Sequence, residues 1–200
     1  MSIEIRSSCL QDLPYIYEIC LKTGASGKDA TELFNDKNML GSYYAAPYIV
    51  NSPEDCFVVV ENGLVCGYIL STKDTNSFYS WMNNSWLPPI RENYKNGFIP
   101  KSDTEKNLLN TILKDCDSEK SSWIKDFPAH LHIDILDTLQ GKGMGRKLME
   151  KLFDNLRSQN ISGIHLGVDK NNQNAQGFYK KIGFSVLKEK EWGFVLGYKL

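Results

Sequence analysis

The sequence predicts a fold of the α/β class, in which strands and helices share one domain. Three observations predict it. Residues 130–136 (HLHIDIL) alternate between polar and apolar with a period of two, which is typical of a strand. Residues 143–158 carry apolar side chains at helical spacing, with charges on the opposite face. Asn62-Gly63 joins two apolar runs, and this dipeptide is a strong signal for a β-hairpin.

The composition excludes several classes of protein. The chain has 200 residues, with 23 Lys and Arg against 24 Asp and Glu, which gives a formal net charge of −1. A nucleic-acid-binding domain would be strongly basic, and this chain is not. Its longest apolar runs are far shorter than the roughly 20 residues that span a bilayer. The N-terminus lacks a basic segment followed by an apolar one, so we expect a cytoplasmic protein without a secretory signal.

Cysteine usage predicts neither disulfide bonds nor a metal site. The five cysteines are an odd number, and none shows the spacing of a zinc site. Cys56 and Cys66 lie within apolar, strand-like runs, where a free thiol behaves as a small hydrophobic side chain.

Hydrophobic periodicity predicts the order of the elements before residue 73 and after residue 128. In the first part we expect strands over 2–7, 56–61 and 64–72, and helices over 12–22 and near 29–39. In the second part we expect strands over 130–136, 163–168, 184–190 and 193–199, a helix over 143–158, and a helix from the N-cap Asn172 to Gly183. On the strand 130–136, the alternation puts His130, His132 and Asp134 on one face.

Residues 75–127 interrupt this regular pattern. The segment is polar and proline-punctuated, with one expected helix near 104–115, and we interpret it as an insertion in one domain that spans 1–200. Its aromatic and acidic side chains leave three roles open: the wall of a pocket for a cationic amine, a homodimer surface, or a satellite of the core. These residues are Trp81, Trp86, Tyr94, Phe98, Asp103, Glu105, Asp115, Asp117, Glu119 and Trp123.

Glycines gather at a strand-to-helix turn, in the segment QGKGMGR (140–146). Glycines there let the backbone approach a ligand closely, and the N–H groups at a helix start attract an anion. The pattern predicts a phosphate or pyrophosphate ligand, with a plain tight turn as the structural alternative. It does not fit the dinucleotide pattern GxGxxG, because Arg146 stands where Gly or Ala is required. GASGKD (24–29) is not a P-loop either, since Lys22 replaces its first glycine.

Two motifs together resemble the Gcn5-related N-acetyltransferase (GNAT) superfamily. Gln140-x-x-Gly143-x-Gly145 matches its pyrophosphate-loop motif, Q/R-x-x-G-x-G/A. Asn172-x-x-Ala175-x-x-x-Tyr179-x-x-x-Gly183-Phe184 matches its later strand–helix motif, which ends in Y-x-x-x-G-F. The resemblance covers 1–72 and 128–200. It implies a mixed, mostly antiparallel central sheet flanked by helices, with a helical or irregular insertion between the third and fourth strands.

Residues 128–136 (PAHLHIDIL) and the long aromatic insertion are also similar to bacterial relatives of the acetyltransferase-like domain of O-GlcNAc hydrolases. One departure from the GNAT pattern is visible. Asp137 stands where the family commonly has a proline, three residues before Gln140.

By this resemblance the glycine loop would hold the pyrophosphate of acetyl-CoA, with Gln140 as its anchor. The binding N–H groups would come from Gly141, Lys142, Gly143, Met144, Gly145 and Arg146. The side chains of Lys142 and Arg146 would add charge, or would simply be solvated. The preceding strand would pair with the pantetheine arm through the backbone of Ile135, Leu136 and Asp137. Asn172 would reach the cofactor arm, cap a helix, or do both.

The resemblance also implies the chemistry. A phenol can donate a proton to a departing thiolate, so we expect Tyr179 to be catalytic, with a core tyrosine as the alternative. The amine must lose a proton before it attacks, and the candidate bases are His132 and Asp134, with Asp74 at the end of the third strand. Each of these three has a structural alternative as part of a buried network.

We therefore expect transfer of an acetyl group from acetyl-CoA to a primary amine by direct attack, without a metal. The acceptor is expected to be a small molecule or a peptide, with neither nucleic acid nor membrane as a partner. The alternative is a non-catalytic acyl-CoA-binding module, because no single residue stands out as the base.

Overall fold

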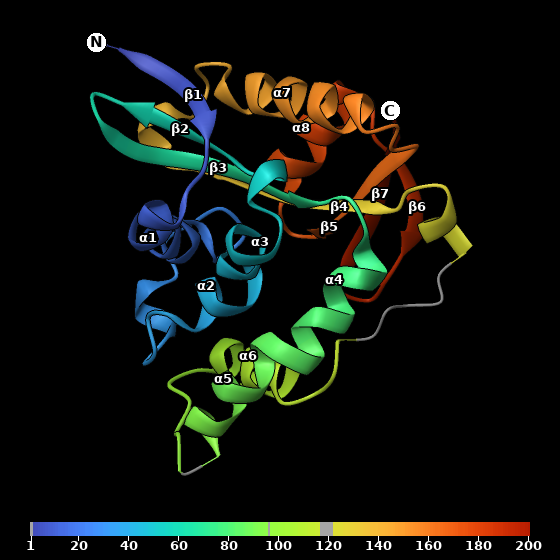
Figure 1. Cartoon of the computed structure of the whole chain (residues 1–200). Coiled ribbons are helices and arrows are strands. Elements are labelled where there is room, and N and C mark those ends of the chain that lie inside the picture. Colours follow the sequence, from blue (N-terminus) through green and yellow to red (C-terminus); the bar gives the residue numbers. More distant parts are fainter. Residues whose placement is uncertain (1, 96, 117–121) are drawn as a thin grey trace.

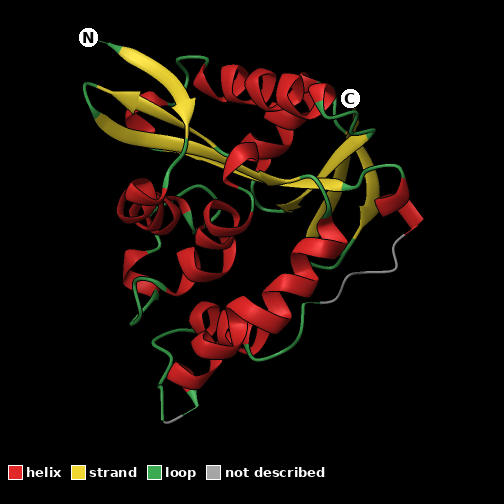
Figure 2. Cartoon of the chain, in the orientation of Figure 1, coloured by secondary structure: helices red, strands yellow, loops and turns green. Residues whose placement is uncertain are grey.

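The central feature of the fold is a twisted sheet with helices on both faces (Figure 1, Figure 2). The computed structural model of the chain describes residues 2–95, 97–116 and 122–200. The strands are β1 (Ile3–Ser7), β2 (Phe57–Glu61), β3 (Leu64–Thr72), β4 (Ala129–Ile135), β5 (Gly163–Asp169), β6 (Ser185–Glu189) and β7 (Gly193–Lys199). The helices are α1 (Leu13–Thr23), α2 (Met39–Tyr44), α3 (Ala46–Asn51), α4 (Thr75–Trp81), α5 (Leu87–Tyr94), α6 (Asp103–Ile112), α7 (Met144–Ser158) and α8 (Gln173–Ile182). None of the helices in these ranges is long and apolar enough to cross a membrane.

The sheet has seven strands within the described residues, in the order β1-β2-β3-β4-β5-β7-β6. Every neighbouring pair is antiparallel except β4 and β5, which run parallel. The prediction of a mixed, mostly antiparallel sheet is confirmed, and the insertion leaves the sheet between its third and fourth strands. The β2–β3 hairpin turns at Asn62 and Gly63, whose φ angles of 51° and 85° are both positive, as a type I′ turn requires.

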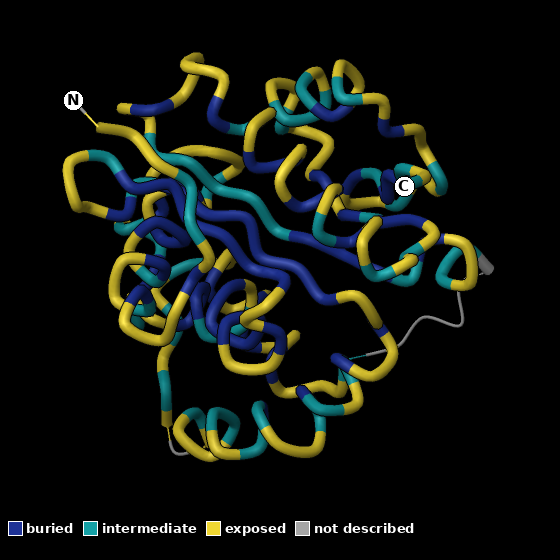
Figure 3. The backbone as a smooth tube through the Cα atoms, turned by 45° about the horizontal axis from the view of Figure 1, so that its top comes forward, coloured by how far each residue is buried: buried dark blue, intermediate teal, exposed yellow. Residues whose placement is uncertain are grey.

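Two hydrophobic cores lie on opposite faces of the sheet, because the side chains of each strand alternate between the faces. We call them the α7 core, under α7 and α8, and the α1 core, under α1 to α6. On β4, Leu131 belongs to the α7 core, whereas His130 packs on Tyr48 and Phe78 of the opposite face. The central strands are buried along most of their length (Figure 3). The predicted stripe of α7 is buried as well, through Met144, Leu148, Met149, Leu152, Phe153 and Leu156.

The segment between α1 and α2 differs from the prediction, because the helix expected near 29–39 is absent. Within this described range there is only a short 3-10 helix at Thr31–Leu33, and α2 begins at Met39. Two side chains explain the difference. Asp29 and Asp36 each accept a hydrogen bond from the N–H group two residues further on, at 2.8 Å. Such turns satisfy the backbone locally and compete with helix formation.

The insertion is more helical than its prolines suggest. The helix α4, a π-helical turn at Met82–Trp86 and the helix α5 follow one another without a break. Pro88 and Pro89 lie in the first turn of α5, where a missing N–H group does no harm. The helix predicted near 104–115 is α6.

The insertion packs against the α1 core. Trp86 donates its indole N–H to the carbonyl oxygen of Ser42 in α2, at 2.8 Å. Buried apolar side chains of the insertion belong to that core, namely Phe78, Met82, Leu87, Leu108, Leu109 and Ile112. Of the three roles left open by the sequence, this packing favours the satellite of the core. Asp117 and Glu119 lie outside the described residues.

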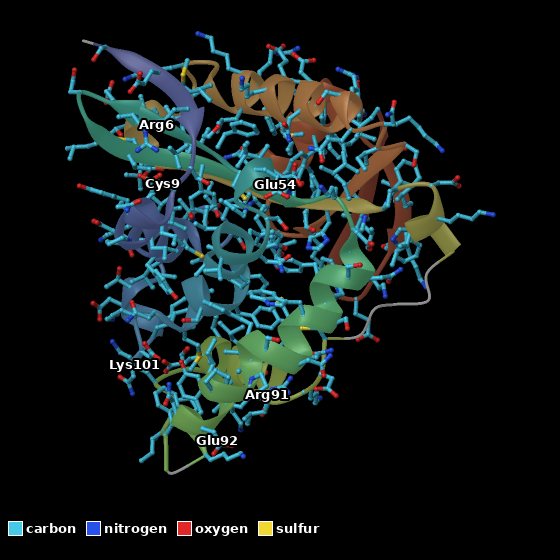
Figure 4. The ribbon with its side chains drawn as sticks, viewed as in Figure 1. Arg6, Cys9, Glu54, Arg91, Glu92 and Lys101 are labelled. Carbon is cyan, nitrogen blue, oxygen red and sulfur yellow. The ribbon has the colours of Figure 1, made fainter. Side chains whose placement is uncertain are left out.

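A buried carboxylate joins the insertion to the segment between α1 and α2, and we call this contact the Glu105 clamp. Oε1 of Glu105 accepts hydrogen bonds from the N–H groups of Asn35 (2.8 Å) and Asp36 (2.9 Å). Oε2 accepts a third from the N–H group of Lys101 (2.6 Å). The Lys101 side chain, labelled in Figure 4, also pairs with Glu32 at 3.0 Å. The clamp thus fixes the segment that follows a turn at residues 25–28, which is part of the site described below.

Asp55 is a second buried carboxylate, and it lacks one partner. Its Oδ1 accepts hydrogen bonds from the amides of Asn155 (2.8 Å) and Gln159 (2.7 Å), whereas Oδ2 has no partner in the described residues. Burial raises the pKa of Asp55 above its ordinary value. A carboxyl group whose pKa is higher in the folded state stabilises the fold while it is protonated. Its contribution is therefore lost as pH rises through the folded pKa.

We expect Asp55→Asn to raise the thermal midpoint near pH 8 and to change it little near pH 4. The amide keeps the Oδ1 acceptor but has no charge to bury at the higher pH. Differential scanning calorimetry at both pH values measures the effect, with the exposed Asp154→Asn on α7 as the control. A lower midpoint at both pH values would contradict this expectation.

Candidate active site

Strands β4 and β5 separate at the centre of the sheet. Each strand has seven residues, yet they pair only at Ala129 with Ile164 and at His130 with His165. Beyond these two pairs, the edge of β4 that faces β5 has no strand partner within the described residues. This edge is therefore open to pairing with an extended ligand.

A cavity of about 620 Å³ lies beside the unpaired part of β4. Four segments of the chain line it: the end of α1 with the turn after it, β4, the glycine loop with the first turn of α7, and α8. The cavity thus brings together the two motifs that the sequence singled out, which are about 30 positions apart in the chain.

The glycine loop opens directly onto this cavity. Gly141 and Gly143 have positive φ angles of 73° and 77°, and Gly143 is the N-cap of α7. A Cβ atom at either position would have no neighbour within 4 Å, so the loop leaves open space on that side. The first N–H groups of a helix have no partner within the helix, and here they belong to Met144, Gly145 and Arg146. The arrangement suits a bound anion.

Close packing fixes the loop on both sides. A Cβ at Gly145 would lie 3.2 Å from the ring of Phe178 on α8, so the two helices approach closely there. Gln140 donates its side-chain amide to the carbonyl oxygen of Ile135 (2.9 Å) and to Oδ1 of Asp137 (3.0 Å). The Asp137 carboxylate, which replaces the usual proline of the family, therefore serves as an acceptor for Gln140.

The charges on the cavity wall are mostly positive. Lys28, Arg146 and Lys181 line the cavity, and Asp134 is the one acidic residue in its described lining. Lys142 does not line it and pairs instead with Glu61 at 3.6 Å. Three cations against one carboxylate favour an anionic ligand.

Asn172 meets the turn after α1 across the cavity. Its Oδ1 accepts a hydrogen bond from the N–H group of Ala175 (3.1 Å), so it is the N-cap that the sequence predicts. A Cβ at Gly27 would lie 3.8 Å from its Nδ2. The turn itself is tight, since Ser26 and Gly27 have positive φ angles of 53° and 89°. The cap uses only the oxygen of the Asn172 amide, and no hydrogen bond of its Nδ2 occurs in the described residues.

Asp134 carries a carboxylate at the cavity wall with a raised pKa. It lies on β4, and its Oδ2 accepts a hydrogen bond from the hydroxyl group of Tyr68 at 2.6 Å. Burial raises the pKa of Asp134 to about 6, while hydrogen bonds from Tyr68 and Thr23 act in the opposite direction. The group is thus largely ionised at neutral pH but close to its titration range, as a general base requires.

Tyr179 lies on α8 and lines the same cavity. Its ring packs on Phe178 and Phe184, with centroid distances of 5.4 and 5.5 Å. Burial, and then the charge of Asp134, raise the pKa of Tyr179 well above its ordinary value. The hydroxyl group stays protonated at neutral pH, and it makes no hydrogen bond within the described residues. It is therefore available as a donor to a ligand.

The other candidate bases lie away from the cavity wall. His132 packs on Tyr44 and Tyr48 at 5.5 Å each, and burial lowers the pKa of His132 to about 4. Asp74 is the N-cap of α4, where its carboxylate accepts from the N–H groups of residues 76 and 77. Among the candidates that the sequence left open, Asp134 is the one that the structure brings to the cavity.

The cofactor-binding residues predicted from the sequence are mostly brought together. The cavity is lined by Ile135, Gln140, Gly141, Gly143, Met144, Gly145, Arg146, Asn172 and Tyr179. Leu136, Asp137 and Lys142 do not line it. The N–H group of Leu136 donates to the carbonyl oxygen of Cys66 (3.0 Å), so its pairing with a ligand stays a prediction.

Similarity to known proteins agrees with this geometry. A family model described as the acetyltransferase (GNAT) family matches residues 112–184, which include β4, the glycine loop, α7, β5 and α8. Over this range the chain is similar to the GNAT family. It is also 24% identical to the protein O-GlcNAcase of Rattus norvegicus over 187 residues, which is 92% of this chain and 20% of that protein. The chain thus spans about a fifth of the length of the curated relatives that it matches.

Solved structures share the fold along the whole length of this chain. The crystal structure of SsHAT matches with a TM-score of 0.86 and 29% identity, over 100% of this chain and 98% of that chain. PaiA N-acetyltransferase from Thermoplasma acidophilum, in complex with coenzyme A, matches with a TM-score of 0.58 and 16% identity, over 100% of both chains.

Sequence reasoning missed part of the cavity wall. Thr23 and residues 26–28 line it from the end of α1, and Phe178 and Lys181 line it from α8. The tight turn at Ser26-Gly27 was a visible signal, because a glycine next to a polar residue favours positive φ. Its position across from Asn172 is a tertiary contact that the local pattern does not contain.

Proposed function

We propose that this protein transfers an acetyl group from acetyl-CoA to a primary amine by direct attack. The observation that carries the proposal is that Asp134 and Tyr179 face the same cavity as the glycine loop. A base for the amine and an acid for the thiolate are thus available where the loop would hold the donor. The acceptor that we propose is a small molecule or a peptide.

The residues present fit the anionic part of acetyl-CoA. The N–H groups at the start of α7 would bind its pyrophosphate, and the open space at Gly143 leaves room for it. Arg146, Lys28 and Lys181 would balance its charge. The unpaired edge of β4 would pair with the amides of the pantetheine arm. Support comes from the PaiA structure, which has the same fold and was solved with coenzyme A.

Two protein groups would then share the proton transfers. Asp134 would take a proton from the acceptor ammonium, directly or through water, as the nitrogen attacks the thioester carbonyl carbon. A C–N bond forms and the C–S bond breaks, and the second proton lost by the nitrogen would restore the Tyr179 phenol, directly or through water. Tyr179 would protonate the departing sulfur, or hold it by a hydrogen bond, because its phenol stays protonated at neutral pH. His132, which stands two residues before Asp134 on β4, remains the alternative base.

The experiment combines binding and turnover of the purified protein. Calorimetry measures acetyl-CoA binding, and release of the CoA thiol is followed with a panel of primary amines. We expect amine-dependent release that Gly143→Val abolishes, since a side chain there is strained at φ 77° and fills the loop. Gly97→Val is the matched control, because Gly97 also has positive φ (81°) but lies in the insertion. Binding without turnover for any amine would instead indicate a non-catalytic acyl-CoA-binding module.

We further propose a cytoplasmic location. Cys9, Cys20, Cys56 and Cys66 form no disulfide bond, and Cys20 and Cys56 are buried. Free thiols persist in a reducing compartment, which supports this placement.

Asn172 allows its two roles to be separated. We expect Asn172→Asp to keep the cap, because a carboxylate oxygen also accepts the N–H group of Ala175. The same change removes the Nδ2 donor, so acetyl-CoA binding should weaken about tenfold while the thermal midpoint holds. Calorimetry and thermal unfolding measure the two effects.

The control for cap loss alone is Asp74→Ala, which removes the N-cap of α4 away from the cavity. It should lower the thermal midpoint without changing acetyl-CoA affinity. Equal affinity in Asn172→Asp and the unaltered protein would show that Asn172 acts as a helix cap alone.

A further inference from the structure

Tyr68 and Asp134 form a buried cross-strand pair behind the cavity. They lie directly opposite each other in the β3–β4 register, so their side chains share one face of the sheet. The Tyr68 hydroxyl group donates to Oδ2 of Asp134 at 2.6 Å, and Tyr68 has no exposed surface. A phenylalanine would pack equally well in the α1 core, so packing alone does not account for this hydroxyl group.

Among the groups around Asp134, the Tyr68 hydroxyl group is the main hydrogen-bond donor to its carboxylate. Thr23 and Cys20 face it from α1, Tyr179 faces it from α8, and His132 precedes it by two residues on its own strand. Burial raises the pKa of Cys20 to about 12, so this thiol is neutral. None of these four groups is a cation at neutral pH, and the cations Lys28, Arg146 and Lys181 line the same cavity.

The direction of the Tyr68 hydrogen bond is fixed by titration. Burial raises the pKa of Tyr68 well above its ordinary value, so the phenol keeps its proton and can only donate to the carboxylate. A donor of this kind stabilises the ionised carboxylate more than the protonated one. Because it occupies Oδ2, an acceptor amine in the cavity would approach the carboxylate at Oδ1.

We propose that Tyr68 is a positioning residue, which holds Asp134 ionised and turns its second oxygen toward the acceptor amine. The proposal rests on the function proposed above, in which Asp134 is the base. Tyr68 does not line the cavity and acts only through Asp134.

The test uses Tyr68→Phe, with Tyr48→Phe as the matched control. Tyr48 is likewise buried on this face, and its hydroxyl group also makes a 2.6 Å hydrogen bond, but to Nε2 of His130. The first readout is the titration of the Asp134 carboxyl carbon by ¹³C NMR, in protein without acetyl-CoA. We expect Tyr68→Phe to move this titration upward by about 1 pH unit, since it removes one hydrogen bond to the charged form. Tyr48→Phe should leave it in place.

The second readout is the pH profile of kcat/KM. Its acid limb should follow the NMR titration upward, so that kcat/KM of Tyr68→Phe falls about fivefold at pH 6 and hardly at all at pH 9. The KM for acetyl-CoA should not change. An unchanged NMR titration overturns the positioning role whatever the rate, whereas a moved titration in a protein without turnover supports it and contradicts the proposed function.

If Tyr68→Phe folds poorly, a second variant tests the same proposal. The shift expected for it in the Asp134 titration has the opposite direction. 3-Fluorotyrosine at position 68 keeps the ring and lowers the pKa of the phenol, which strengthens the donated hydrogen bond. The Asp134 titration should then move downward. A shift in the same direction as expected for Tyr68→Phe, or no shift, would overturn the proposal.

Discussion

Replacing Asp134 by asparagine is expected to lower kcat by about 100- to 10,000-fold, the range associated with a general base. The amide has the same shape, and its oxygen can still accept the hydrogen bond of Tyr68, so the fold should persist. What it lacks is the ability to take a proton from the acceptor ammonium. Acetyl-CoA affinity should hold, because the glycine loop and the three cavity cations are untouched.

The measurements are initial rates across pH 5 to 9, thermal unfolding and calorimetry. In the unaltered protein kcat/KM should rise through about pH 6, the pKa of Asp134, as the carboxylate ionises. In Asp134→Asn this rise near pH 6 should disappear. If kcat falls less than about threefold and the rise remains, the base is His132 or water.

Replacing Tyr179 by phenylalanine should lower the turnover number by roughly 10- to 1000-fold. The ring keeps its contacts with Phe178 and Phe184, so folding and acetyl-CoA affinity should change little. Only the hydroxyl group is lost, and it has no hydrogen-bond partner in the described protein. Under the proposed function, the interaction removed would be the one with the departing thiolate.

The matched control is Tyr198→Phe, on the α7 side of the sheet, where the Tyr198 ring stacks on Phe153 at 4.4 Å outside the cavity. It should leave the turnover number unchanged. If Tyr179→Phe keeps full turnover while the thermal midpoint drops by several degrees, Tyr179 is a core residue only. Unchanged rate and unchanged stability would mean that water or another side chain protonates the thiolate.

Most of the sheet and the long helices could be predicted from the sequence, because their burial patterns are periodic. The stripe of α7 is an example, since this helix buries one face and the burial leaves a clear spacing in the chain. The strand 130–136 was visible through its alternation of polar and apolar residues, although both of its faces are covered. The prediction was wrong near 29–39, where apolar spacing suggested a helix. There the side chains of Asp29 and Asp36 form local turns that the spacing does not reveal.

The candidate site was predictable where one short segment builds it. The glycine loop depends on local backbone conformation, so its residues are visible in the sequence. The position of Asp134 beside Tyr179 depends on the separation of β4 from β5, and that of Lys28 depends on the turn after α1. These are tertiary relations between distant segments, which only the structure supplies. The choice among His132, Asp134 and Asp74 illustrates the difference.

The Glu105 clamp has a consequence for folding kinetics. It joins Asn35 to Glu105, which are 70 positions apart, so it can form only after a long loop has closed. Local elements such as the β2–β3 hairpin have no such entropic cost, and we expect them to be organised first. Glu105→Gln should then accelerate unfolding while leaving the folding rate nearly unchanged, which stopped-flow measurements in urea would show. Slower folding in this variant would instead mean that the clamp is already formed in the transition state.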